Sequence, residues 1–239
     1  MDFDNFDLVS VLGANDATDY IEYLQSLKIS TEHITLIDGS FSSCAYISTD
    51  QALDQLTFFI ANQAVDPNMK YLKFGNPADY GLAILAPHNM NLIVEAFRFA
   101  RDNKIDIVFD PGQQLAAFGA KLFREILANS KYLILNKQEL EYALELYDLS
   151  YDELLKTVDY VIVTDSENPV VIQSHMHNYN QTFEPEMSSK VVDPTGCGDA
   201  FRAGFFASLS MGLEMNECVK RAMYLAGLCL GSPVTQDYL

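Results

Sequence analysis

Basic residues are scarce in this chain of 239 residues. Its 15 Lys and Arg stand against 33 Asp and Glu, which gives a formal net charge of −18. Nucleic acids and anionic membrane surfaces bind basic faces, so we expect neither as a partner. A phosphorylated nucleotide is compatible with this charge, because backbone N–H groups and a metal ion hold such a ligand within an acidic protein.

Paired cysteines and long apolar runs are also missing. The cysteines, Cys44, Cys197, Cys218 and Cys229, form no Cys-x-x-Cys pair. Their spacing favours free thiols in a reducing compartment over a disulfide framework. No apolar run reaches the length of a membrane span, and the acidic residues 1–5 lack the basic start of a signal peptide. We therefore expect a cytoplasmic protein without membrane contact.

Apolar residues are plentiful, and their order predicts an α/β fold. They make up 49% of the chain, which is enough for a core and predicts one domain over residues 1–239. Short apolar segments alternate with segments of helical periodicity, which predicts a mostly parallel sheet with helices on both faces. We expect strands at 7–12, 33–37, 44–48, 56–60, 71–74, 105–109, 132–135, 160–163 and 170–172, and helices at 16–27, 89–101, 115–128, 137–147, 201–211 and 215–230.

Polar residues follow several of the expected strands. Ligands of such sheets bind beyond the carboxyl ends of the strands. Asp110, Asn136, Thr164 and Asp193 end four expected strands, so we expect them to share one edge of the sheet. The alternative is that each is an ordinary cap or turn residue. The pair His175 and His177 has no third ligand nearby, so we expect an exposed hairpin there and not a metal site.

The most informative segment is 191–205, Val-Val-Asp-Pro-Thr-Gly-Cys-Gly-Asp-Ala-Phe-Arg-Ala-Gly-Phe. It predicts a strand end, a tight turn of small residues and the start of a helix. Gly196, Cys197 and Gly198 leave their N–H groups uncovered at a helix N-terminus, which favours an anion. Asp199 is the next residue, and its carboxylate could remove a proton from an attacking hydroxyl. The alternative is a plain turn with Asp199 as a helix N-terminal charge.

This segment resembles the second signature of the PfkB (ribokinase-like) carbohydrate and nucleoside kinases, Asp-Thr-x-Gly-Ala-Gly-Asp. Asp193, Gly196, Gly198 and Asp199 match, and Cys197 replaces the usual Ala. The resemblance implies a Rossmann-like three-layer α/β sandwich. It also implies transfer of the ATP γ-phosphoryl group to a hydroxymethyl group of a nucleoside or sugar. Asp199 would be the catalytic base, and Gly196, Cys197 and Gly198 the anion hole.

A second motif of the family lies at 136–139, Asn-Lys-Gln-Glu. It matches the Asn-x-x-Glu motif, which implies that Asn136 and Glu139 hold Mg²⁺ through its waters. The same spacing suits a capping box, with Asn136 as N-cap and Glu139 at the third helical position. Asp193 beside Thr195 resembles the family's site for a monovalent cation such as K⁺.

Residues 159–172 align with the nucleotide-binding strand–turn–strand of the family, usually Thr-x-Gly-x-x-Gly. Thr164 matches, but Ser166 and Pro169 stand at the two glycine positions. The resemblance implies ATP contacts from Thr164, Ser166 and Thr195. Ser and Pro narrow the backbone freedom that glycine gives. The alternative function is therefore a catalytically inactive homologue that acts as a binding module.

Further resemblance favours a nucleoside over a sugar. The run 110–114, Asp-Pro-Gly-Gln-Gln, resembles the segment after a central strand in bacterial adenosine-kinase-like members. Cys197 and residues 213–236 extend this resemblance. An adenosine-like nucleoside is thus the first expected substrate. A dinucleotide-dependent oxidoreductase ranks last, because no Gly-x-Gly-x-x-Gly follows the first strand.

The start of the family pattern has no counterpart here. Complete members begin with a strand whose Asp holds the substrate hydroxyls, followed by a Gly-Gly motif, and this sequence contains no Gly-Gly. We expect a chain that lacks the family's N-terminal part, with an incomplete lid. The sheet would then expose an apolar edge, which favours a homodimer.

Overall fold

A computed structural model describes residues 6–49, 55–60, 65–66, 68–185, 191–233 and 235. The chain divides into two compact units that interleave along the sequence. Unit 1 comprises Met1–Ile47, Thr57–Val163 and Ile172–Asn180, and unit 2 comprises Ser48–Leu56, Thr164–Val171 and Gln181–Leu239. None of the described helices is both long and apolar enough to cross a lipid bilayer.

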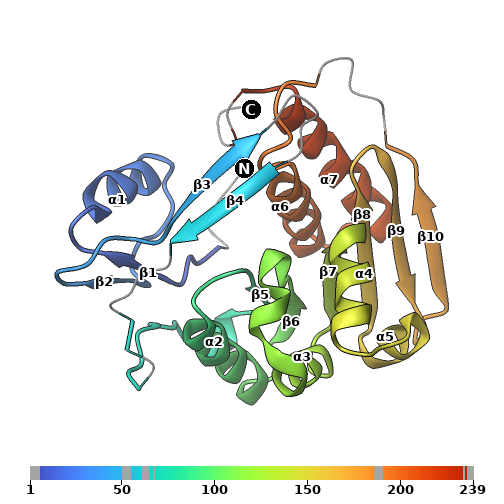
Figure 1. The fold of residues 1–239 in the computed structure, drawn as a ribbon, viewed down its shortest axis with the longest axis horizontal. Helices are drawn as coiled ribbons and strands as arrows, with labels where there is room; N and C mark the ends of the chain where they lie inside the picture. The colour runs from blue at the N-terminus through green and yellow to red at the C-terminus, as the bar shows by residue number, and fades with distance from the viewer. Residues whose placement is uncertain are drawn as a thin grey trace. The chain divides into compact units, whose positions relative to one another are not determined.

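The described strands form one six-stranded sheet and two small sheets (Figure 1). The large sheet has the order β10-β9-β8-β7-β6-β5, and the small ones pair β1 with β2 and β3 with β4. Their bounds are β1 (Ser10–Gly13), β2 (Ile34–Ile37), β3 (Cys44–Thr49), β4 (Gln55–Ile60), β5 (Leu82–Leu85), β6 (Asp106–Phe109), β7 (Tyr132–Asn136), β8 (Tyr160–Asp165), β9 (Asn168–Ser174) and β10 (Tyr179–Phe183).

Helices alternate with these strands, as the sequence predicts. They are α1 (Ala17–Ser26), α2 (Met90–Asp102), α3 (Gly119–Leu127), α4 (Lys137–Leu146), α5 (Tyr151–Thr157), α6 (Cys197–Ser210) and α7 (Met215–Leu230), with 3₁₀ turns η1 (Pro77–Asp79) and η2 (Gly112–Ala117). Within unit 1, α2 packs on β5 and β6, and α4 on β7.

Parallel pairing joins β5, β6 and β7. Leu82 pairs with Asp106, and Val108 pairs with Tyr132. Residues 132–135 of β7 are all buried, which is typical of a parallel strand covered on both faces. The prediction of a parallel core with flanking helices is confirmed for this part of the sheet.

Two short loops make the rest of the sheet a meander. Ser166 and Glu167 connect β8 to β9, and residues 175–178 connect β9 to β10. Loops this short join antiparallel strands, so the sheet is mixed. His175 and His177 lie in the second loop, as expected for a hairpin. Among the described residues, no three His, Cys, Asp or Glu side chains gather as metal ligands would.

Several predicted elements were wrong or missed. No strand forms at 71–74, where Thr35 Oγ1 instead donates a hydrogen bond of 2.6 Å to the Tyr71 carbonyl. The described residues directly before Asp193, 191 and 192, form no strand either, and the Val192 N–H instead bonds to the Leu230 carbonyl at 2.9 Å. The sequence reading missed β5, α5 and β10, which are too short to show clear periodicity.

Helices α6 and α7 approach each other closely at Gly204. A Cβ atom built on Gly204 would lie 2.8 Å from the Ala222 Cα and 3.1 Å from the Arg221 carbonyl oxygen. The two backbones therefore touch here, and no side chain fits between them.

We predict that Gly204→Ala lowers the free energy of unfolding by about 1–3 kcal/mol, because the added methyl group separates the two helices. Urea unfolding followed by circular dichroism measures the change. Gly227→Ala in α7 is the matched control, since its Cβ atom would meet nothing within 4 Å. Better helix propensity should make that variant more stable by about 0.5–1 kcal/mol. A Gly204→Ala protein as stable as its parent would show that the helices do not meet at this residue.

Candidate functional site

The turn before α6 is built from local hydrogen bonds within unit 2. The Asp193 Oδ1 atom accepts the Thr195 N–H at 2.8 Å. Hydrogen bonds from the Thr195 side chain and backbone hold the pKa of Asp193 below its usual value. Asp193 is thus a firmly ionised carboxylate that fixes the entry to the turn.

The chain changes direction at Gly196. Its φ is 82° and it is the N-cap of α6, with no side chain capping that helix end. A Cβ atom there would lie 2.9 Å from the Cβ atom of Thr235. Both the left-handed backbone and the close neighbour exclude a side chain at this position.

The predicted anion hole is only partly open. The Cys197 N–H donates to the Pro194 carbonyl at 3.2 Å, so this amide already has an acceptor. The N–H groups of Gly196 and Gly198 have no acceptor among the described residues. Two of the three predicted amides are therefore available to an anion, together with the positive end of the α6 dipole.

Asp199 lies in the first turn of α6 and is exposed. Its carboxylate has no hydrogen-bond or ion-pair partner in the described part of the chain. An exposed carboxylate without a partner beside open amides is geometrically suited to accept a proton from a bound hydroxyl.

Two thiols lie under the turn. The Cys229 Sγ atom is 3.4 Å from the Thr195 carbonyl oxygen. Burial raises the pKa of Cys197 to about 12, with a further contribution from the neighbouring Cys229. Both thiols therefore stay protonated and act as small packing groups, which explains why Cys197 can replace the usual Ala.

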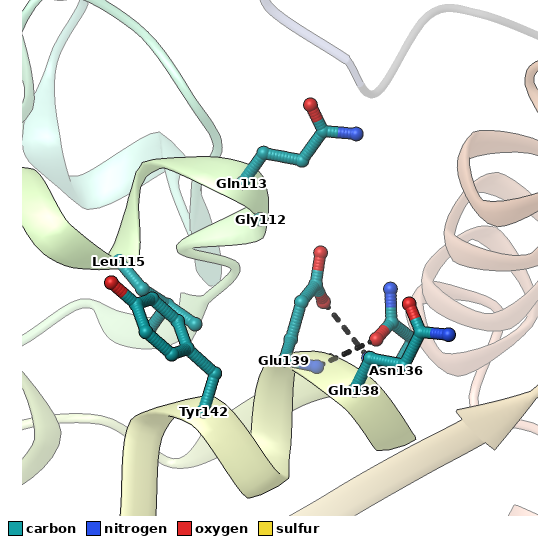
Figure 2. A pocket seen from close by; sticks show the side chains of 7 residues that line it. All are labelled: Gly112, Gln113, Leu115, Asn136, Gln138, Glu139 and Tyr142. Carbon is teal, nitrogen blue, oxygen red and sulfur yellow. Dashed lines mark hydrogen bonds between the residues drawn. The ribbon is translucent and has the colours of Figure 1, made fainter. Parts of the chain in front are cut away.

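The second motif forms a complete capping box at the start of α4 (Figure 2). Asn136 Oδ1 accepts the Glu139 N–H at 2.7 Å, and Glu139 Oε2 accepts the Asn136 N–H at 2.9 Å. The capping interpretation is confirmed. It uses one oxygen of Glu139, and the other points away from the cap into open space in Figure 2.

A cavity of about 270 Å³ opens beside this cap. It lies in unit 1 between η2 and α4, and its lining is Gly112, Gln113, Leu115, Asn136, Gln138, Glu139 and Tyr142. Its polar wall consists of carboxamide groups, the Glu139 carboxylate and the Tyr142 hydroxyl, and the carboxamides and the carboxylate supply oxygens. Such oxygens suit a hydrated Mg²⁺ ion, which keeps most of its water and needs few protein contacts.

Asp110 and Asn136 lie at the ends of neighbouring parallel strands. Asp110 directly follows β6 and is 4% exposed, and Asn136 is the last residue of β7. Thr164 is the last but one residue of β8. Asp193 does not end a strand, so that part of the expectation was wrong. An Asx turn, and not a strand, positions its carboxylate.

Sequence reasoning missed His88, which follows β5. Its backbone N–H donates to Gln114 Oε1 at 3.1 Å, and its Nδ1 accepts the Asn89 N–H at 2.7 Å. Burial lowers the pKa of His88. The His88 backbone therefore connects the run 110–114 to the start of α2, and its ring accepts the Asn89 N–H and lies 3.1 Å from Ser10 Oγ through Nε2. In the sequence only a lone histidine before a predicted helix marked this position.

The predicted nucleotide turn has the backbone of a glycine turn. Ser166 adopts a φ of 49°, a left-handed conformation in which glycine is favoured. Pro169 stands near the start of β9 and donates no N–H. Residues 164–171 thus keep the predicted hairpin while departing from the two glycines.

Comparison with known proteins defines the class of this protein. Residues 4–239 match the pfkB family of carbohydrate kinases, and the chain belongs to this family. Transfer of a phosphoryl group from ATP is the family's activity. The family predicted from the turn at 193–199 is confirmed.

Two proteins similar to this chain are archaeal nucleoside kinases. One from Methanocaldococcus jannaschii is 30% identical over 221 residues, which cover 90% of this chain and 69% of the relative. One from Methanothermobacter thermautotrophicus is 24% identical over 237 residues, which cover 96% of this chain and 74% of the relative. The narrower assignment to a bacterial adenosine-kinase-like branch and the absence of an N-terminal part stay predictions.

Solved structures confirm the fold. The nucleoside kinase of Burkholderia thailandensis in complex with inosine matches with a TM-score of 0.87 and 26% identity, covering 97% of this chain and 76% of that one. The Methanocaldococcus jannaschii nucleoside kinase, described as an archaeal member of the ribokinase family, matches with a TM-score of 0.86 and 26% identity, covering 98% and 76%. The predicted ribokinase-like α/β fold is therefore correct.

Proposed function

We propose that this chain transfers the γ-phosphoryl group of ATP to the hydroxymethyl group of a nucleoside. The observation that carries the proposal is the exposed carboxylate of Asp199 beside the amides of Gly196 and Gly198, none of which has a partner among the residues that the structure describes. Membership of the pfkB family and the nucleoside-kinase relatives support the reaction and favour a nucleoside over a sugar.

In this proposal Asp199 accepts the proton of the acceptor hydroxyl as its oxygen attacks the γ-phosphorus atom. The bond from that phosphorus to the bridging oxygen breaks, and ADP leaves. The Gly196 and Gly198 amides stabilise negative charge on the phosphoryl oxygens. Thr164, Ser166 and Thr195 remain our proposed ATP contacts.

Two cations belong to the proposal. The second oxygen of Glu139 and the cavity beside it fit a hydrated Mg²⁺, which when bound neutralises phosphate charge. Asn136 would contact the same water shell. Asp193, kept ionised by its Thr195 hydrogen bonds, is our proposed ligand for a monovalent cation such as K⁺.

The alternative is an inactive homologue that binds nucleotide without turnover. Ser166, which stands at a left-handed position suited to glycine, favours it. Calorimetry with Mg²⁺–ATP, followed by phosphorylation assays on adenosine, inosine, cytidine and ribose, separates the two functions. Turnover of a nucleoside supports the kinase. ATP binding with no turnover on any acceptor supports the inactive module.

The base role of Asp199 predicts that Asp199→Asn lowers kcat by about a hundredfold or more while ATP affinity is kept, because the amide cannot accept the proton. Steady-state assays and calorimetry measure the two quantities. Glu217→Gln, which neutralises the corresponding first-turn acid of α7, should leave both unchanged. Equal turnover in the Asp199→Asn variant and the parent would remove Asp199 from the mechanism.

The metal role of Glu139 predicts that Glu139→Gln raises the Mg²⁺ concentration for half-maximal rate about tenfold, because a neutral amide attracts the ion less. The glutamine oxygen still caps α4, so the thermal midpoint should change little. Glu153→Gln is the matched control, since Glu153 forms the same capping box at α5. An unchanged Mg²⁺ dependence would show that Glu139 caps α4 and takes no part in metal binding.

We also propose a homodimer through the sheet of β3 and β4. Its side chains are largely exposed and apolar, Tyr46 at 65%, Leu56 at 60% and Phe58 at 59% among them. Neither strand carries a charged residue, so two copies meet here without the repulsion expected of a protein with a net charge of −18. Sedimentation analysis should give a dimer, and Phe58→Glu a monomer. A monomeric parent at micromolar concentration contradicts this assembly.

A further inference from the structure

The side chain of Arg202 covers the first turn of α6. Arg202 lies four residues after Gly198, and helical side chains lean toward the N-terminus over the preceding turn. A Cβ atom built on Gly198 would lie 2.6 Å from Arg202 Nη1 and 3.8 Å from its Cζ atom. The guanidinium group therefore occupies the space that a side chain at 198 would need.

The inner part of the Arg202 side chain is removed from solvent. The Nε atom of Arg202 is buried and the residue as a whole is half-buried. The outer nitrogen Nη1 lies 2.6 Å from where a Cβ atom of Gly198 would be, and the Gly198 amide has no acceptor among the described residues. A guanidinium group on the same helical turn as this amide forms a two-part donor set that matches phosphate oxygens.

The charges of the segment around Arg202 indicate a role for its guanidinium group. Residues 191–210 contain two acids, Asp193 and Asp199, and Arg202 is the only Lys or Arg among them. The N–H groups of a helix end carry about half a positive charge, which is less than the charge of one carboxylate. A full positive charge close by would therefore stabilise a phosphoryl group beside Asp199, in addition to the proposed Mg²⁺.

From this geometry we infer that Arg202 contacts the phosphoryl group in transfer and counters the negative charge of Asp199, acting together with the Gly198 amide. The inference rests on the proposed kinase function and adds a residue to it. Gly198 then has two uses, since its bare backbone presents an amide and leaves room for the guanidinium. Because ADP has no γ-phosphate, the contact discriminates between ATP and ADP.

The test compares Arg202→Gln and Arg202→Lys with the parent by calorimetry. Each is titrated with a non-hydrolysable ATP analogue and with ADP, both with Mg²⁺, and kcat is measured with ATP. For Arg202→Gln we expect about a tenfold loss of analogue affinity, ADP affinity within twofold, and a fall in kcat of about tenfold to a hundredfold. Arg202→Lys should recover part of each loss. Arg221→Gln, an exposed arginine of α7 in the same unit, is the matched control and should change none of them.

Gly198→Ala gives a second, independent test. Its methyl group must displace the guanidinium, so it should lower analogue affinity in the parent and add little in the Arg202→Gln background. The inference is overturned if the variants lose affinity equally for ADP and the analogue, or lose affinity for neither. Arg202 would then have a packing role only. A parent that binds the analogue without turnover refutes the kinase proposal alone, and the ratio of affinities still decides the role of Arg202. A parent that binds neither nucleotide overturns both.

Discussion

The left-handed backbone at Gly196 is the constraint on which the candidate phosphate site depends. With a φ of 82°, this residue turns the chain from the Asp193–Thr195 hydrogen bond into the first turn of α6. The Cβ atom of Thr235 closes the space on its outer side. Any side chain at 196 would strain the backbone and move Thr235, and the amide of Gly198 and the carboxylate of Asp199 would move with the turn.

Small residues throughout unit 2 support this turn. Gly204 lets α6 touch the backbone of α7, and the last turn of α7 supplies the carbonyl of Leu230 that holds Val192. The thiols of Cys197 and Cys229 fill the space under the turn without ionising. The position of the amides is therefore set by helix packing some distance away, and not by the loop sequence alone.

Sequence patterns predicted the family and the parallel core better than the contacts that support the candidate site. The run of Gly196 to Asp199 identified the family because its small residues and carboxylate are needed together, and the alternation of apolar segments gave the parallel core. Short elements such as β5 carry too few residues for periodicity to appear. Other features depend on contacts between residues far apart in sequence, which no local pattern records. They are the hydrogen bond of Val192, the close approach at Gly204 and the burial of His88.

The capping box at Asn136 and Glu139 leaves room for the metal role that we propose for the same pair of residues. The cap occupies Asn136 Oδ1 and Glu139 Oε2 and fixes both side chains. A fixed Glu139 presents its second oxygen to the cavity at little further cost in side-chain entropy. The two interpretations that the sequence left open are thus compatible, because the cap uses only one oxygen of Glu139. Ser150 and Glu153 form the same box at α5. A capping box alone therefore does not define the candidate metal site, which we place at Glu139 because of the cavity between η2 and α4.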